Sequence, residues 1–388
     1  MSDDKNTFAY VGNWSKTLDG PCGFGIYRYI TETGDLELIK SVFTDITVGA
    51  TCLDSKRNIL YCTNELETYP GNDMGGGGQV YAFAIDSETG DLTEINHQPS
   101  YGSLPSYVAV DATGKYLIVT NHTGHTPITK TVKDASGKYR IVLEYDEATT
   151  VLYKLDNDGS IGDPCDIYRH SGSGPLPRQT HPHPHSVVMS PSGNLFAVCD
   201  KGADRIYFFR INRETDRLEV CGGEGYKSIT GSSPRYSAFH PKLPYFYMNN
   251  ETKTIVRAFR YDEDGKLEPI CTVSALPENC EDNLTMMQTD IRVHPSGKYL
   301  YTLIRGISVA TVFEIKEKTG EIEKIQAVML DGTCPRGIGI SPDGRFMLIA
   351  ALRSSEVLVW AIGEDGRLSP TGKKASQPHP GTVTFFPS

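Results

Sequence analysis

His294-Pro-Ser-Gly-Lys298, followed at once by the apolar run Tyr299-Leu-Tyr-Thr-Leu-Ile304, is the stretch that decides the fold. A tight polar turn next to such a run predicts two antiparallel strands joined by the turn. The same arrangement occurs six times along the 388 residues. The six turns begin at Asp54, Asp111, Ser190, His240, His294 and Ser341. A unit that recurs this often indicates a repeat architecture.

A second turn signal alternates with the first. It has the form Thr-Gly-Asp-Leu, and Thr-Gly or Asp-Gly between apolar runs is a strong hairpin signal. It occurs seven times, beginning at Thr33, Thr89, Asp158, Thr215, Asp264, Thr319 and Asp365. The spacing of roughly 46 to 69 residues is near the length of a propeller blade. Helical periodicity is absent over any long window, so the chain is predicted to be all-β.

The difference between six and seven signals has a simple explanation at the chain ends. The run Phe8–Gly12 begins directly at the second strand of a unit, and Gly381–Phe386 has the apolar character of the missing first strand. Exchange of a strand between the two ends would close the ring and leave no free edge there. We therefore predict one seven-bladed β-propeller domain over residues 1–388, with four-stranded antiparallel blades and a ring closed by the terminal strands.

Charge and cysteine usage restrict the partners. The net charge of −10 disfavours binding to nucleic acid or to an anionic membrane, so an anionic substrate would need a local basic pocket. Nine scattered cysteines without a Cys-x-x-Cys pair argue against a disulfide or zinc framework and favour a reducing compartment. The N-terminal segment has no apolar core, and no run of 18 apolar residues exists, so we expect a cytoplasmic protein.

The repeat also predicts which residues share one mouth of the ring. The strands on either side of each first-type turn are antiparallel, so the start of one lies beside the end of the other. Counted from the turn proline or its equivalent, the positions six residues earlier are Gly49, Ser106, His185, Arg235, Thr289 and Arg336. The positions ten residues later are Glu65, His122, Lys201, Glu251, Arg305 and Leu352, and the N-terminal unit adds Trp14. Ionisable side chains at these positions must be solvated or paired with an opposite charge, and together they predict a basic pocket at the mouth.

Two segments outside the repeat bear on this mouth. Residues 123–148 form an insertion that is predicted to make a hairpin of its own. The run His181-Pro-His183-Pro-His185 invites a metal interpretation, since imidazole is a common ligand. However, prolines separate the three histidines and only His185 falls on a predicted mouth position. We expect no metal and no cofactor, with His181 and His183 at the edge of the pocket.

Several motifs together resemble the lactonase, seven-bladed β-propeller family over essentially the whole chain. They are Tyr10-Val-Gly12, His183-Pro-His185-Ser-Val, Asp204-Arg205-Ile, Pro234-Arg235, Asn250-Glu251, Ile291-Arg292-Val and Pro335-Arg336. The family includes bacterial 6-phosphogluconolactonase of the propeller type and a fungal enzyme that cyclises 3-carboxy-cis,cis-muconate. This chain departs from the family in having Trp14 where Tyr is frequent, and in the insertion at 123–148.

The resemblance implies the site residues. A His, two Arg and a Glu form the proposed active-site set of the cyclising enzyme, and the matching positions in this chain are His185, Arg235, Arg305 and Glu251. We expect these four to be catalytic. The expected substrate-binding residues are Arg336, His122, Glu65, Lys201, Trp14 and His183.

The resemblance and the pocket together imply hydrolysis of a small anionic sugar-acid lactone, with 6-phosphogluconolactone as the expected substrate. Glu251 or His185 would activate water, and Arg235 and Arg305 would stabilise the oxyanion or hold an anionic group of the substrate. Two alternatives stay open. One is a muconate-type cycloisomerase, which needs the same acid and the same arginines, and the other is a non-catalytic propeller that binds a ligand or protein on its rim.

Overall fold

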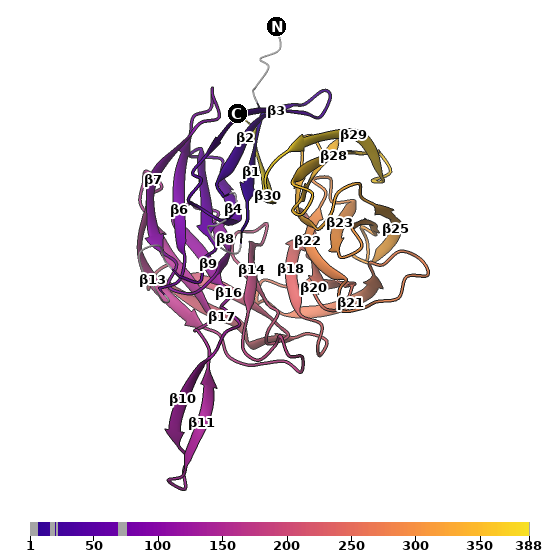
Figure 1. Ribbon diagram of the computed structural model, residues 1–388. Helices are drawn as coiled ribbons and strands as arrows, with labels where there is room; N and C mark the ends of the chain where they lie inside the picture. The colour runs from indigo at the N-terminus through magenta and orange to yellow at the C-terminus, as the bar shows by residue number, and fades with distance from the viewer. Residues whose placement is uncertain (1–6, 16–19, 21, 69–75, 388) are drawn as a thin grey trace.

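The computed structural model describes residues 7–15, 20, 22–68 and 76–387. Seven four-stranded antiparallel sheets stand around a central axis, as Figure 1 shows, and no helix occurs in the described part of the chain. The predicted seven-bladed propeller is confirmed. The innermost strands of successive blades contact one another all the way round, and the last of them, β26 (Pro335–Ile340), contacts β30 (Pro380–Pro387).

The blades follow the chain in order, and within each blade the strands run from the innermost to the outermost. The first is β30, β1 (Thr7–Asn13), β2 (Phe24–Ile30) and β3 (Asp35–Val42), and the second is β4 (Val48–Asp54), β5 (Ile59–Asn64), β6 (Gln79–Ile85) and β7 (Leu92–Pro99). The third is β8 (Pro105–Val110), β9 (Tyr116–Asn121), β12 (Thr149–Leu155) and β13 (Ile161–Arg169), and the fourth is β14 (Pro184–Met189), β15 (Phe196–Asp200), β16 (Arg205–Asn212) and β17 (Arg217–Lys227).

The fifth blade is β18 (Pro234–Phe239), β19 (Tyr245–Asn250), β20 (Ile255–Tyr261) and β21 (Leu267–Ser274). The sixth is β22 (Met287–Val293), β23 (Tyr299–Arg305), β24 (Val309–Ile315) and β25 (Ile322–Met329). The seventh is β26, β27 (Phe346–Ala351), β28 (Glu356–Ile362) and β29 (Leu368–Ser376).

The two ends of the chain close the ring as predicted. Strand β1 pairs antiparallel with β30, from Thr7 opposite Pro387 to Gly12 opposite Thr382. The N-terminal strand is thus the second strand of its blade, and the C-terminal strand is the first. Because β1 has a partner strand on each side, β30 and β2, it leaves no open sheet edge at the junction.

Hydrogen bonds link the second strand of a blade to the Thr-Gly or Asp-Gly hairpin turn of the next blade. Buried tyrosines of the second strands donate hydrogen bonds to the carbonyl of the hairpin glycine in the next blade. Tyr10 bonds to Gly90 at 2.9 Å and Tyr301 bonds to Gly366 at 3.0 Å. Both glycines have positive φ, 76° and 75°, which favours a residue without a side chain. The repeat therefore fixes each strand pair and also joins neighbouring blades.

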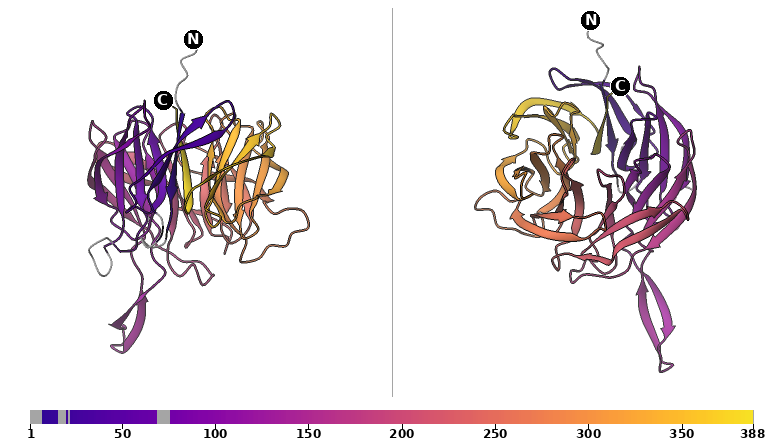
Figure 2. Two further views of the ribbon diagram at one scale, coloured as in Figure 1. Left: turned by 45° about the horizontal axis from the view of Figure 1, so that its top comes forward. Right: turned by 180° about the vertical axis from the view of Figure 1, so that it is seen from behind.

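The insertion at 123–148 forms the predicted separate hairpin, β10 (Ile128–Lys133) and β11 (Tyr139–Glu144). It extends away from the ring in Figures 1 and 2, and Tyr139 and Ile141 are 68% and 74% exposed. The hairpin follows β9, which ends at Asn121, so it leaves from the mouth that the end of β9 borders. No helix among the described residues is long and apolar enough to span a membrane.

Candidate active site

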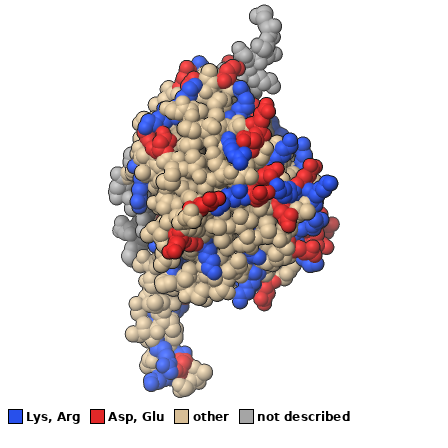
Figure 3. All heavy atoms as spheres, turned by 90° about the vertical axis from the view of Figure 1, so that its right-hand side faces the viewer, with Lys and Arg blue, Asp and Glu red and all other residues tan. Residues whose placement is uncertain are grey.

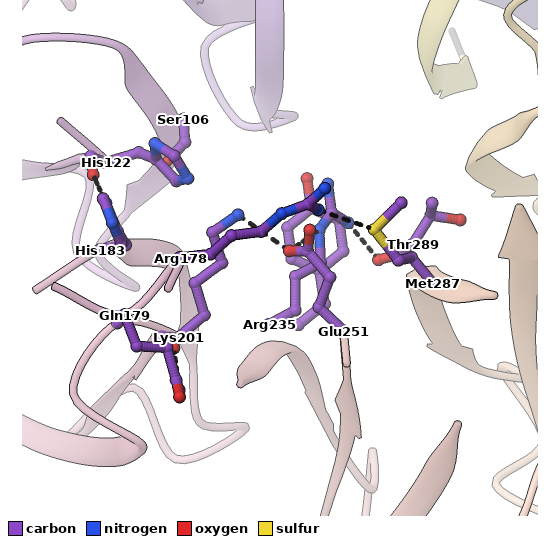
Figure 4. Close-up of polar contacts among 12 residues, drawn as sticks. Ser106, His122, Arg178, Gln179, His183, Lys201, Arg235, Glu251, Met287 and Thr289 are labelled. Atoms are coloured by element: carbon purple, nitrogen blue, oxygen red, sulfur yellow. Dashed lines mark hydrogen bonds and ion pairs between the residues drawn. The ribbon is translucent and has the colours of Figure 1, made fainter. Parts of the chain in front are cut away.

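The predicted mouth positions converge because each innermost strand starts opposite the end of the second strand. Pro234 pairs with Asn250, and Pro184 pairs with Asp200. The next residues along the chain are Arg235 and Glu251 in one blade, and His185 and Lys201 in the blade before it. Figure 4 shows Arg235, Glu251 and Lys201 gathered at the mouth.

Glu251 lies at the centre of three cations. Its carboxylate is 2.9 Å from Lys201 Nζ, 3.0 Å from Arg305 Nη2 and 3.3 Å from Arg235 Nε. Arg235 is almost completely buried, and its guanidinium donates a hydrogen bond to the Thr289 carbonyl and lies over the ring of Tyr236. Three blades thus contribute one cation each to a single carboxylate, and Arg235 comes from the blade of Glu251 itself.

The surroundings of Glu251 fix its ionisation. Burial alone would raise the pKa of its carboxyl, but Lys201, Arg305 and Arg235 together hold that pKa far below the usual 4.5. Burial lowers the pKa of Lys201, and the Glu251 carboxylate only partly offsets this. A carboxylate stabilised so strongly is a weak base. Its charge instead keeps the three cations together at the mouth.

A second buried carboxylate lies elsewhere on the same mouth. Glu65 accepts a hydrogen bond from Trp14 Nε1 at 2.8 Å and pairs with Arg336 Nη2 at 3.3 Å. The Arg336 guanidinium lies 4.0 Å from the centre of the Trp14 ring. Burial raises the pKa of Glu65, and Arg336 and Trp14 lower it by less. Gly49 is required beside it, because an added Cβ would lie 2.6 Å from the Glu65 carboxylate.

Histidines occupy the third part of the mouth. The His122 ring lies 4.9 Å from that of His185 and 4.8 Å from that of His183. Burial lowers the pKa of His185, and the Arg235 charge adds to the effect, so the ring is neutral near pH 7. His185 Nδ1 is buried without a hydrogen-bond partner. An unpaired buried ring nitrogen of this kind costs free energy, and a donor that reached it would remove that cost.

A cavity of about 530 Å³ opens at this mouth. It is lined by His125, Tyr145, Pro177, Arg178, Thr180, Lys201, Ser233, Glu251, Thr252 and Arg305. Of the predicted residues, it therefore contains Lys201, Glu251 and Arg305. The other predicted residues do not line it: His122, His183, His185 and Arg235 are buried nearby in the ring, and Glu65, Trp14 and Arg336 form their separate group.

Several lining residues were missed because they lie outside the repeat. His125 and Tyr145 flank the hairpin of the insertion, and Arg178 and Thr180 belong to the loop before β14. A signal was present, since both segments lengthen connections that end at the predicted mouth. Ser106 and Thr289, by contrast, hold neighbouring innermost strands, with hydroxyls that donate to the Pro184 and Pro335 carbonyls.

The other end of the channel offers different chemistry. A cavity of about 580 Å³ there is lined mainly by apolar residues of the innermost strands. Among the described residues that line it, Arg292 is the one charged side chain, and it pairs with Asp290 at 3.3 Å. The outer side of the ring mixes both signs of charge, as Figure 3 shows. The mouth around Glu251 is therefore the candidate active site.

Seven blades around a channel with convergent buried charges at one mouth define a propeller of the enzymatic type, distinct from scaffold propellers. The comparison with known families agrees: the family described as "Lactonase, 7-bladed beta-propeller" matches residues 8–385. The chain belongs to this family.

Individual relatives are similar over nearly their whole length. The chain is 27% identical to the 6-phosphogluconolactonase of Bacillus subtilis over 381 residues, which cover 97% of both chains. It is 26% identical to the 6-phosphogluconolactonase of Formosa agariphila, over 90% of this chain and 91% of the relative.

Solved structures show the same fold. The periplasmic gluconolactonase of Pseudomonas aeruginosa superposes with a TM-score of 0.85 at 22% identity, over 98% of this chain and 99% of that one. A putative 6-phosphogluconolactonase of Bacteroides fragilis superposes with a TM-score of 0.81 at 25% identity, over 99% of both chains.

Proposed function

We propose that this protein is a lactonase that hydrolyses the ring ester of a sugar-acid lactone, with 6-phosphogluconolactone as its substrate. The observation that carries the proposal is the group of cations around the buried Glu251, two of which line a cavity on an acidic protein. The family and the names of the relatives support lactone hydrolysis. This activity would place the protein in carbohydrate metabolism, in the pentose phosphate pathway.

The cations supply recognition of an anionic substrate. Lys201, Arg305 and Arg178 all line the cavity, and the Nε of Arg305 is a buried donor without a hydrogen-bond partner. Guanidinium groups bind phosphate and carboxylate with two parallel hydrogen bonds. We assign the substrate phosphate to Arg178 and Lys201, because these two side chains line the cavity from different segments of the chain and leave Arg305 for the reacting carbonyl.

The hydrolytic step needs a base, an oxyanion site and an acid. We assign the base to His185, because its Nδ1 is an unpaired acceptor whereas the Glu251 carboxylate is held by three cations. Burial and the Arg235 charge lower the pKa of His185, so the imidazolium is short-lived and gives its proton up readily. His185 takes a proton from water as the water oxygen bonds to the lactone carbonyl carbon. Arg305, which lines the cavity, stabilises the oxyanion, and the buried charge of Arg235 adds to the field there. The ring C–O bond then breaks, and the imidazolium returns the proton to the leaving alkoxide.

Proton release from 6-phosphogluconolactone in weak buffer tests the proposal. Arg305→Ala is expected to reduce kcat/KM by about 100- to 1,000-fold, the usual effect of removing one oxyanion donor. Arg305→Lys keeps the charge and should recover part of that loss. Arg210→Ala, on the outer surface, is the matched control and should be unchanged.

Two results would reject parts of the proposal. Turnover of Arg305→Ala at the wild-type rate would show that this mouth is not the active site. Equal kcat/KM for gluconolactone with and without the phosphate would reject the assignment of a phosphate subsite. Spontaneous hydrolysis is subtracted by a parallel reaction without enzyme.

We also propose a cytoplasmic location. All nine cysteines are free, including Cys62 and Cys199, which are completely buried in the blades. Free thiols in this number suit a reducing compartment.

A further inference from the structure

We propose that His122, His125 and His183 form a binding site for a divalent transition-metal ion of the zinc type, beside the substrate cavity. This site is separate from the groups that the proposed hydrolysis uses, and its test does not depend on that activity. Three imidazoles with one open position are a common ligand set for zinc. Cu²⁺, Ni²⁺ and Co²⁺ are also held by imidazole.

The three histidines come together from segments far apart in the sequence. His122 directly follows β9, His125 lies in the connection to the hairpin, and His183 directly precedes β14. One ring nitrogen from each lies within 4.8 Å of the corresponding nitrogens of the other two. In a tetrahedral site with metal–nitrogen distances near 2.0–2.1 Å, the nitrogens lie about 3.4 Å apart. Each nitrogen–nitrogen distance would therefore have to shorten by about 1.4 Å at most, from 4.8 Å, to complete the site.

Two of the rings are already oriented as metal ligands. His183 Nδ1 lies 2.7 Å from the His122 carbonyl oxygen, and His122 Nδ1 lies 2.9 Å from the Thr123 carbonyl oxygen. A carbonyl only accepts, so both Nδ1 atoms carry hydrogen and both Nε2 atoms present a lone pair. Figure 4 shows His122 and His183 next to each other with this contact drawn. Metal-bound histidines are fixed in the same way, by donation from the second ring nitrogen.

The buried lone pair of His183 is an independent observation that points to a ligand. Its side chain is 0% exposed, and its Nε2 has no hydrogen-bond partner. An imidazole acceptor left unsatisfied in the interior costs free energy. Binding of a cation would remove this cost without any change in the tautomer.

The neighbouring histidines do not take part in the same way. His181 Nε2 lies 3.0 Å from the Gly124 carbonyl oxygen and so carries hydrogen, and the lone pair of its Nδ1 accepts from the Thr180 hydroxyl at 3.0 Å. The His185 ring lies on another side of His122, edge to face at 4.9 Å. The proposed ligands therefore differ from the three histidines of the His181-Pro-His183-Pro-His185 run. Only His183 belongs to both sets.

Charges of both signs face the three rings. Lys201 acts on all three rings and Arg178 on His125, both from the side of the cavity, and both oppose a cation. The Glu251 carboxylate pairs with Lys201 at 2.9 Å, which reduces this repulsion. On the other side, the carboxylates of Glu67 and Asp146 approach Gly124, between His122 and His125. These acidic groups favour a cation at the site.

His125 is the ligand that can move to complete the site. It is the one exposed member of the three, in a connection without regular structure, and it lines the substrate cavity. His122 and His183 are held by the ends of their strands. The fourth position of the ion would therefore face the cavity and take water or an oxygen of the substrate.

Titration of the chelator-treated protein with Co²⁺ and Zn²⁺ tests the site. Co²⁺ in a tetrahedral nitrogen site gives strong visible absorption, so we expect one equivalent to produce it and Zn²⁺ to abolish it. His125→Ala, at an exposed position, should weaken Zn²⁺ binding by at least about 100-fold in calorimetry. This exceeds the usual effect of removing a residue that only hydrogen-bonds to a ligand. His183→Gln should do the same, with circular dichroism to show that it folds.

His97→Ala is the matched control, because it removes an exposed histidine on β7, the outermost strand of another blade. It should bind Zn²⁺ like the wild type. The proposal is overturned if Co²⁺ produces no tetrahedral spectrum with the wild type. It is also overturned if His125→Ala binds as tightly as His97→Ala, because the ion would then be held at scattered surface histidines.

Discussion

Glu251 and Glu65 occupy the same position of the repeat in two different blades, and their surroundings give them opposite properties. Each directly follows a second strand, β19 or β5, and each is buried at the same mouth. Three cations lower the pKa of Glu251, whereas burial raises the pKa of Glu65. The repeat therefore determines where a side chain lies, and the adjacent blades determine what it does.

The neighbours explain the difference. The blades on either side of Glu251 place Lys201 and Arg305 at the equivalent position. The blades on either side of Glu65 place the neutral groups Trp14 and His122 there, and Glu65 forms an ion pair with Arg336, two blades away. Pairs of carboxylates with separated pKa values frequently have separate roles.

The largest effect is expected for Glu251→Gln. The substitution leaves the buried Arg235 and the partly exposed Lys201 and Arg305 without their counter-charge, and breaking a buried pair such as Arg235 with Glu251 costs about 3–5 kcal/mol of the free energy of unfolding. Because the pKa of Glu251 is lowered on folding, its stabilisation is present above pH 4.5 and is lost as the pH falls toward the folded-state value. Urea unfolding should show a wild-type advantage that is constant from pH 7 to pH 5 and shrinks below pH 4.5. An advantage that grows with acid would contradict this account.

Glu65→Gln should have a smaller effect, with the opposite dependence on pH. The folded-state pKa of Glu65 is raised, so ionisation destabilises the wild type as the pH rises above 4.5. The uncharged variant avoids this cost. Its free energy of unfolding should lie within about 2 kcal/mol of the wild type and should improve relative to it from pH 4 to pH 7. Equal slopes for the two variants would remove the distinction between the carboxylates.

The smallest effect is expected for the hairpin. Replacing residues 128–144 with a Gly-Gly link removes exposed strands whose ends are already paired, Ile128 with Glu144. The free energy of unfolding should change by about 0.5 kcal/mol or less, as for most exposed positions. Both pH slopes should stay the same. A change in either slope would show that the hairpin contributes to the field at the mouth.

The sequence contains the fold in full, because each strand pair carries its own turn signal and the chain ends supply the odd strand. It also identifies most of the mouth, since fixed offsets from a turn place Arg235 beside Glu251. His125, Tyr145 and Arg178 lie in segments without a repeat and therefore have no offset to count from. The opposite pKa shifts were also out of reach, because they depend on side chains contributed across blades.

A crystal structure with bound 6-phosphogluconate is the most direct test of the central claim. The account predicts that the product lies in the cavity at the Glu251 mouth, with its carboxylate within hydrogen-bond distance of Arg305 and its phosphate within that distance of Arg178 or Lys201. Product bound beside Glu65, Trp14 and Arg336, or at the other end of the channel near Arg292, would contradict it.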